Sequence, residues 1–194
     1  ISEINDDLVI ASIDETDTRG RELPSRIYLF QGLPKGDKME LIIQKAVELG
    51  AYGIIPVAMK RSVMKLDSKK AESKVKRWNA ISESAAKQSK RSIIPAVHDV
   101  MTFAQAAEYA KTLDMVLLPY ECADGMQATK DKLSSIKPGS SIGIFIGPEG
   151  GFDGSELTIA HEAGFDVITL GRRILRTETA GMMLLSVLMY QLED

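Results

Sequence analysis

The sequence IGIFIGPEGGF, residues 142–152, is the most informative stretch of this chain. Its apolar first half predicts a buried strand, and Asp153 just after it is a favourable helix start. In α/β proteins, a glycine-rich turn between a buried strand and a helix is a common place for a ligand. Gly150 and Gly151 can adopt positive φ and let a ligand approach the backbone, while Pro148 stiffens the turn. The stretch therefore predicts an α/β protein with a binding site at this turn.

A second turn of this kind follows along the chain. After the apolar residues 167–170 comes GRRILRTETA, residues 171–180, which leads into an almost wholly apolar helix ending near residue 192. Loops that follow the strands of a parallel sheet meet at one edge, so the two turns predict one shared pocket. Taken alone, GPEGG is equally well explained as an ordinary tight turn. The sequence contains neither the P-loop pattern nor the Rossmann dinucleotide pattern, so those nucleotide sites are not predicted.

The rest of the chain alternates between strand-like and helix-like segments, which is typical of an α/β domain. Trp78 falls on the apolar stripe of its helix and is predicted in the core rather than as a platform for base stacking. Predicted strands cover residues 27–31, 53–57, 93–97, 115–119, 142–146 and 167–170, and predicted helices cover 38–49, 69–89, 103–112, 126–136, 155–163 and 180–192.

Length and composition narrow the class of protein. A chain of 194 residues with 44% hydrophobic content can bury the core of one main domain. The net charge of -3 argues against attraction of nucleic acid by overall charge. Between residues 60 and 91, however, eleven Lys or Arg accompany three acidic residues, which indicates a local surface for a polyanion.

Cysteine and histidine usage argue against disulfide and metal chemistry. Cys122 is the single cysteine, so it cannot form an intramolecular disulfide, and the sequence has no Cys/His cluster with zinc spacing. His98 and His161 fall outside both loops and are expected to be structural or surface residues. No apolar run approaches the roughly 20 residues of a membrane span. We therefore predict a cytoplasmic protein that binds neither a metal nor a membrane.

Four ordered motifs resemble those of one family. They are KGDKMELIIQKAVELG (residues 35–50), KRW…ISESAAKQSKR…IP (76–95), IGPEGGF (146–152) and LGRRILRTETA (170–180). Together they closely resemble the bacterial 16S ribosomal RNA uridine-N3 methyltransferases of the SPOUT, or trefoil-knotted, superfamily. The resemblance implies a parallel-sheet SPOUT domain over residues 22–194, with a C-terminal trefoil knot. It also implies that residues 1–21 are a remnant of an N-terminal PUA-like β-barrel and a linker.

The resemblance further implies that S-adenosyl-L-methionine is the cofactor, bent within the knot. The adenine of such a cofactor needs an apolar slot and hydrogen bonds at its edge, which the backbone of the second loop and nearby apolar walls can supply. The candidate cofactor-binding residues are Leu118, Pro119, Glu121, Ile146, Gly147, Pro148, Glu149, Gly150, Gly151, Leu170, Gly171, Leu175, Arg176, Thr177, Glu178, Thr179 and Ala180.

Methylation of uridine at N3 removes a weakly acidic imide proton, so the enzyme must position the groups and stabilise negative charge on the uracil. Arg176 is the candidate for this stabilisation, because the planar donors of a guanidinium suit a carbonyl edge. Its alternative role is an ion pair with Glu178 or Glu149. Glu178 or Glu121 is a candidate to orient a group or to accept the proton. The alternative role for either residue is to hold the ribose or to balance the positive charge of the cofactor.

The resemblance also implies an RNA substrate and a second copy of the chain. Lys60, Arg61, Gln88 and Arg91 are the candidate RNA contacts, because they lie in family-like segments near strand or helix ends. The lysines at positions 69, 70, 74 and 76 are interpreted as a solvated helix face. Since apolar residues surround the helix 180–192, it is expected to be covered on all sides, and the family implies a homodimer.

The sequence thus predicts an enzyme that uses S-adenosyl-L-methionine to methylate N3 of a uridine in 16S ribosomal RNA of the small ribosomal subunit. Two alternatives stay open. One is a SPOUT methyltransferase with another RNA target. The other is a non-catalytic RNA-binding or ribosome-assembly module with a vestigial cofactor pocket.

Overall fold

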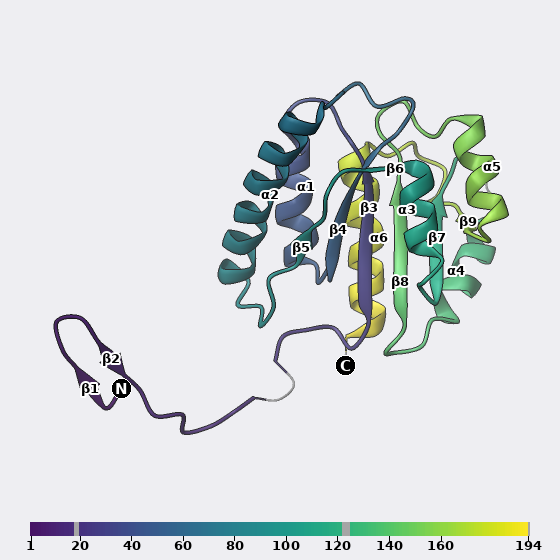
Figure 1. Ribbon diagram of the computed structural model, residues 1–194. Coiled ribbons are helices and arrows are strands. Elements are labelled where there is room, and N and C mark those ends of the chain that lie inside the picture. Colours follow the sequence, from purple (N-terminus) through teal and green to yellow (C-terminus); the bar gives the residue numbers. More distant parts are fainter. Residues whose placement is uncertain (18–19, 122–124, 194) are drawn as a thin grey trace.

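The computed structural model describes residues 1–17, 20–121 and 125–193, and Cys122 lies outside them (Figure 1). A parallel sheet runs through the domain in the order β5-β4-β3-β8-β7-β9, with β6 also pairing with β4. The predicted α/β class is therefore confirmed. The strands are β3 (Arg26–Gly32), β4 (Gly53–Ala58), β5 (Ala96–Val97), β6 (Met101–Thr102), β7 (Met115–Pro119), β8 (Ser141–Ile146) and β9 (Asp166–Ile168).

Helices pack on both faces of this sheet (Figure 1). Successive strand residues point to opposite faces, so Leu29 of β3 packs on the side of α1, α2 and α6, whereas Phe30 packs on the side of α3 and α5. Phe30 stacks on Phe145 of β8 with 4.3 Å between ring centroids. Trp78 is 1% exposed, which confirms its core position. The helices are α1 (Lys38–Glu48), α2 (Ser68–Gln88), α3 (Phe103–Ala110), α4 (Met126–Ser134), α5 (Gly154–Glu162) and α6 (Thr177–Leu192).

Two predicted strands are shorter than the sequence pattern indicated, in both cases near side-chain hydrogen bonds. The strand predicted at 93–97 is only Ala96–Val97, because Pro95 has no N–H and its carbonyl accepts a hydrogen bond from the Ser82 hydroxyl. The strand predicted at 167–170 ends at Ile168. There the backbone of Thr169 bonds to the hydroxyl of Thr129 on α4, at 3.0 Å and 3.1 Å, instead of to a neighbouring strand.

The C-terminal helix α6 returns from the edge strand β9 to the middle of the sheet, where it packs on α1, β3 and β8 (Figure 1). Leu184, Leu185 and Leu188 are buried there. Tyr190 and Val187 are 87% and 36% exposed, so the expected cover on all sides is not provided by the described part of the chain. No helix among the described residues, α6 included, is long and apolar enough to cross a membrane.

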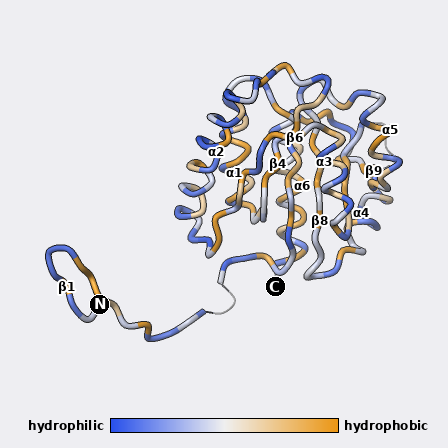
Figure 2. Tube along the Cα trace, in the orientation of Figure 1, coloured by the Kyte–Doolittle hydropathy of each residue, from blue (hydrophilic) through white to orange (hydrophobic). Residues whose placement is uncertain are grey.

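The N-terminal segment forms a small antiparallel hairpin of β1 (Glu3–Ile4) and β2 (Val9–Ile10), set apart from the domain (Figure 1). Figure 2 shows apolar stretches in this segment, where Ile4 and Val9 are 68% and 58% exposed. The boundary predicted near residue 21 and the barrel origin of this segment stay predictions.

A partly buried ion pair between Arg91 and Glu22 stabilises the start of the domain. The guanidinium of Arg91 donates to the Glu22 carboxylate, at 3.0 Å from Nε, and to the carbonyls of Val47 and Ala51. The Arg91 side chain is only 4% exposed and its donors are used within the fold, so these contacts do not support its predicted contact with RNA, which stays a prediction. Arg91 instead joins the ends of α1 and α2 to the segment before β3 that carries Glu22.

Replacement of Glu22 with Gln is expected to destabilise the fold by about 1–3 kcal/mol at neutral pH, since Arg91 keeps its burial and loses its charged partner. Burial raises the pKa of Glu22, but the hydrogen bond and charge of Arg91 and two backbone N–H groups lower it more, to a net value below 4.5. A lowered carboxyl pKa stabilises the fold above pH 4.5, and this contribution disappears as pH falls through the folded-state pKa. Urea unfolding at several pH values should show the variant and the wild type converging in acid.

A matched control is Glu72→Gln on the exposed surface of α2, which removes the same charge. It is expected to change the free energy of unfolding by less than about 0.5 kcal/mol. A Glu22→Gln protein as stable as this control at neutral pH would contradict the assigned role of the pair.

Candidate active site

A cavity of about 710 Å³ lies at the carboxyl ends of β7, β8 and β9. This volume is in the range of small-molecule sites, and the edge of the sheet is where α/β proteins place them. The two glycine-rich loops share this cavity, as the sequence predicted. The candidate cofactor residues that line it are Pro119, Glu121, Ile146, Gly147, Pro148, Glu149, Gly150, Gly151, Leu170, Gly171, Leu175, Arg176, Thr177 and Ala180.

Three candidate residues do not line the cavity. Leu118 is fully buried in the hydrophobic cluster around Phe30, on the face of the sheet covered by α3 and α5, so it is not a wall of the site. Thr179 lies exposed in the first turn of α6. Glu178 is turned toward Lys38 and its side chain is 17% exposed.

Several residues that line the cavity were not predicted from the sequence. Most are neighbours of predicted ones, so a wider window around each loop would have included them. Lys38 is different, because it begins α1, far from either loop in sequence, and the only signal for it was its place in the KGDK motif. The additional lining residues are Lys38, Tyr120, Phe152, Thr169, Arg172, Arg173 and Ile174.

Gly150 and Gly151 of the first loop serve different purposes. Gly151 has φ +67°, the left-handed conformation predicted for it, and its N–H closes the turn on the carbonyl of Pro148 at 2.9 Å. Gly150 is needed for space instead. A Cβ at Gly150 would lie 2.9 Å from Cβ and 3.1 Å from the carbonyl oxygen of Arg61. The loop after β4 therefore packs directly against the cavity loop.

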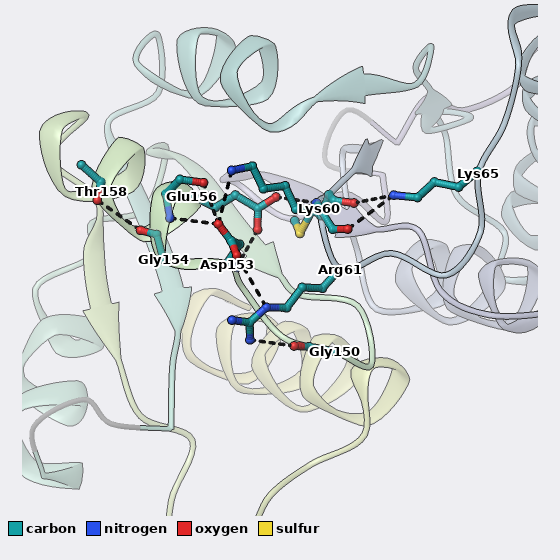
Figure 3. Close-up of polar contacts among 10 residues, drawn as sticks. Lys60, Arg61, Lys65, Gly150, Asp153, Gly154, Glu156 and Thr158 are labelled. Atoms are coloured by element: carbon teal, nitrogen blue, oxygen red, sulfur yellow. Dashed lines mark hydrogen bonds and ion pairs between the residues drawn. The ribbon is translucent and has the colours of Figure 1, made fainter.

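Figure 3 shows the polar contacts that join these two loops. The backbone N–H of Lys60 donates to the buried carboxylate of Glu156 at 2.8 Å, and Arg61 donates to the carbonyl of Gly150 at 3.2 Å. The pKa of Asp153 falls to about 2, through hydrogen bonds from Ser155 and then through Lys60. Two of the predicted RNA contacts, Lys60 and Arg61, thus hold the cavity loop in place.

Gln88 does not lie with these two residues. The helix α2 runs from the side of the carboxyl end of β4 back toward the start of that strand (Figure 1). Its last residue is Gln88, and Arg91 just beyond it bonds to the carbonyls of Val47 and Ala51 before β4, so Gln88 lies at the end of the sheet opposite the cavity. Gln88 is exposed there. The structure therefore does not bring the four predicted RNA contacts into one surface.

A buried hydrogen-bond chain joins both cavity loops to the core. Gln31 of β3 donates to the hydroxyl of Thr177 at 2.8 Å, and that hydroxyl donates to the carbonyl of Gly147 at 2.7 Å. Thr177 therefore connects α6 to the first loop. Neither Thr177 nor Thr179 caps the helix, because α6 begins after Arg176 without a side-chain cap.

The acidic residues of the loops pair with Lys38. Its ammonium group lies 2.9 Å from Oε1 of Glu149 and 3.3 Å from Oε2 of Glu178. Arg176 is exposed at the cavity and makes no ion pair with any residue that the structure describes. The alternative in which Arg176 pairs with Glu178 or Glu149 is therefore not supported. The described residues also contain no group of three or more His, Cys, Asp or Glu that could hold a metal ion.

Comparison with known proteins defines the class. A family model described as an RNA methyltransferase domain matches residues 21–189, so this part of the chain is an RNA methyltransferase domain. The ribosomal RNA small subunit methyltransferase E of Bacillus subtilis is 42% identical over 196 residues, covering 100% of this chain and 77% of that protein. The chain belongs to the family of the ribosomal RNA small subunit methyltransferases E.

Two solved structures resemble this chain. One is a ribosomal RNA small subunit methyltransferase E from Neisseria gonorrhoeae bound to S-adenosyl methionine, with TM-score 0.75 and 34% identity, covering 88% of this chain and 69% of that one. The other is a putative methyltransferase from Legionella pneumophila with bound S-adenosyl methionine, with TM-score 0.79 and 33% identity, covering 88% and 68%. Both relatives are longer than this chain.

Proposed function

We propose that this chain transfers the methyl group of S-adenosyl-L-methionine to N3 of a uridine in 16S ribosomal RNA of the small ribosomal subunit. The observation that carries the proposal is the cavity of about 710 Å³ shared by two glycine-rich loops, in a member of a family of ribosomal RNA methyltransferases. The choice of uridine as the substrate base, and of N3 as the methylated position, rests on the resemblance to the uridine-N3 methyltransferases.

The donor set of the cavity fits this cofactor. Ile146, Leu170 and Leu175 provide apolar walls, and the backbone groups of residues 170–177 provide donors and acceptors for an adenine edge. Glu121 and Glu149 bring negative charge to a site for a cationic cofactor. When bound, the cofactor supplies an electrophilic methyl group on a sulfonium.

The residues of the chain would act mainly by position and charge. Arg176 is exposed at the cavity, so its guanidinium can donate to a uracil carbonyl and stabilise the negative charge that grows when N3 loses its proton. Glu121 lines the cavity and is the candidate proton acceptor. Glu178 lies outside the cavity lining and is held by Lys38, so we assign it a supporting role instead of proton transfer.

The exposed arginines of the second loop suggest where RNA approaches. Arg172 and Arg173 line the cavity, are exposed and make no ion pair among the described residues. Lys60 and Arg61 lie on the neighbouring loop. We propose that these four cations contact phosphates around the target uridine.

The assay is incubation of the protein and S-adenosyl-L-methionine with free 16S RNA and with small subunits that lack the modification. A methyl group on N3 blocks the pairing edge of the base, so reverse transcriptase should stop at one uridine, and nucleoside mass spectrometry should find 3-methyluridine. Methylation of another base would favour a different RNA methyltransferase. A folded protein that does not bind the cofactor would favour a non-catalytic assembly module.

We also propose that the C-terminal segment forms a trefoil knot and that two copies associate through α6. The return of α6 from the edge strand β9 to the centre of the sheet supports the knot. Exposed Tyr190 and Val187 support a partner on the open side of α6.

Multi-angle light scattering at micromolar concentration is expected to give twice the 21.2 kDa mass of the chain. Replacement of Tyr190 with Lys should shift the mass toward the monomer, because it places a charge on an apolar interface. A monomeric wild-type protein would contradict the dimer.

A further inference from the structure

Lys38 connects three segments that are separate in sequence. It is the first residue of α1, Glu149 belongs to the first cavity loop, and Glu178 belongs to the first turn of α6. The Lys38 ammonium group lies between the two carboxylates, 2.9 Å from Glu149 and 3.3 Å from Glu178. A single cation therefore bridges the two loops that form the cavity.

The bridge is supported by the backbone just before α1. The N–H of Lys35 donates to both carboxylate oxygens of Glu149 at 3.2 Å. The first loop also lies against β3, because a Cβ at Gly32 would come within 2.7 Å of Pro148. Residues 32–38 thus pack against the first loop, and Lys38 is the residue of this segment that also contacts α6.

The Glu178 carboxylate is partly buried, and the positive charge of Lys38 offsets the cost of that burial. Oε2 of Glu178 is buried and accepts no hydrogen bond in the described part of the chain, so attraction to Lys38 is the contact that offsets its burial. Burial raises the pKa of Glu149, but the hydrogen bond from Lys38 and backbone N–H groups lower it, so the net shift is downward. The hydrogen bond to Glu149 raises the pKa of Lys38. Without Lys38, the carboxylates of Glu149 and Glu178 would repel each other at the place where Lys38 now lies between them.

We propose that Lys38 is a positioning residue of the cofactor site, which holds the two cavity loops together by bridging Glu149 and Glu178. The inference rests on the proposed function for the identity of the ligand, but the bridge itself is a property of the protein without ligand. Lys38 does not act on the uridine. It keeps the backbone groups of both loops where a cofactor can bind them.

The test is Lys38→Gln, with Lys35→Gln as the matched control. Lys35 is exposed, its side chain makes no ion pair among the described residues, and its backbone N–H survives the substitution. Calorimetric titration with S-adenosylhomocysteine should show binding to Lys38→Gln weakened by about tenfold or more, as for residues coupled in one ion-pair network. The control should bind like the wild type.

A second variant separates the bridge from simple packing. Adding Glu178→Gln to Lys38→Gln removes one of the two repelling charges, and is expected to restore part of the lost affinity. Lys38→Arg retains the charge and should bind more tightly than Lys38→Gln. If neither change restores affinity, the bridging role is wrong.

Hydrogen exchange on the protein without ligand makes the inference independent of the proposed function. Amides of residues 149–151 and 177–178 should exchange faster in Lys38→Gln than in Lys35→Gln. Equal exchange in the two variants would overturn the proposal. A wild-type protein that binds no cofactor would remove the proposed function, while the exchange comparison would still decide the role of Lys38.

Discussion

Replacement of Arg176 with Ala is expected to lower the rate of methyl transfer by about 10²–10³-fold, the loss typical for one donor that stabilises developing charge. Arg176 lines the cavity, is exposed, and makes no ion pair with the described residues. Its guanidinium is therefore available to the substrate. Single-turnover kinetics at saturating cofactor, combined with calorimetry, should show a large loss of rate with a much smaller loss of cofactor affinity.

Arg176→Lys is the informative comparison. Lysine keeps the positive charge but lacks the planar pair of donors, so it should recover only a small part of the rate. Full recovery would show that charge alone matters. An unchanged rate in Arg176→Ala would remove Arg176 from the mechanism.

Gly150→Ala is expected to weaken cofactor binding by about 10–100-fold and to destabilise the fold by about 1–3 kcal/mol, as for insertion of a methyl group into a packed site. The new Cβ would lie 2.9 Å from Cβ of Arg61 and 3.1 Å from its carbonyl oxygen. Arg61 cannot move away freely, because the neighbouring N–H of Lys60 is bonded to buried Glu156 at 2.8 Å. The cavity loop must shift instead.

The control for this prediction is Gly154→Ala, a few residues further along. A Cβ at Gly154 meets nothing within 4 Å, and the residue is the first of α5, where alanine is a better helix former. This variant should bind the cofactor like the wild type. If Gly150→Ala also binds normally, the close approach of the two loops does not shape the cavity.

The sequence predicted the elements well where one periodicity dominates. The apolar strand before the GPEGG turn, the stripe of Trp78 on α2 and the helix after Asp153 all lie where the pattern placed them. The shared cavity was also predictable, since carboxyl ends of parallel strands meet at one edge. Strand ends were less predictable, because Thr129 and Ser82 provide bonds that depend on tertiary position.

The roles of charged residues could not be predicted, because they depend on partners distant in sequence. Arg91 resembled a surface cation in the sequence, yet its guanidinium bonds to Glu22 and to two backbone carbonyls within the fold. Lys60 and Arg61 have exposed side chains, but they also bond to Glu156 and to the cavity loop, which the local sequence does not indicate. Lys38 was not singled out at all, since nothing local shows that Glu149 and Glu178 converge on it.

We propose that the two loops form a site for S-adenosyl-L-methionine. The decisive measurement is calorimetric titration of the folded chain with S-adenosyl-L-methionine and with S-adenosylhomocysteine. We expect one site per chain, with dissociation constants on the order of micromolar, equivalent to a binding free energy of about 8 kcal/mol. Absence of binding to a folded protein would contradict the cofactor site and every catalytic role built on it.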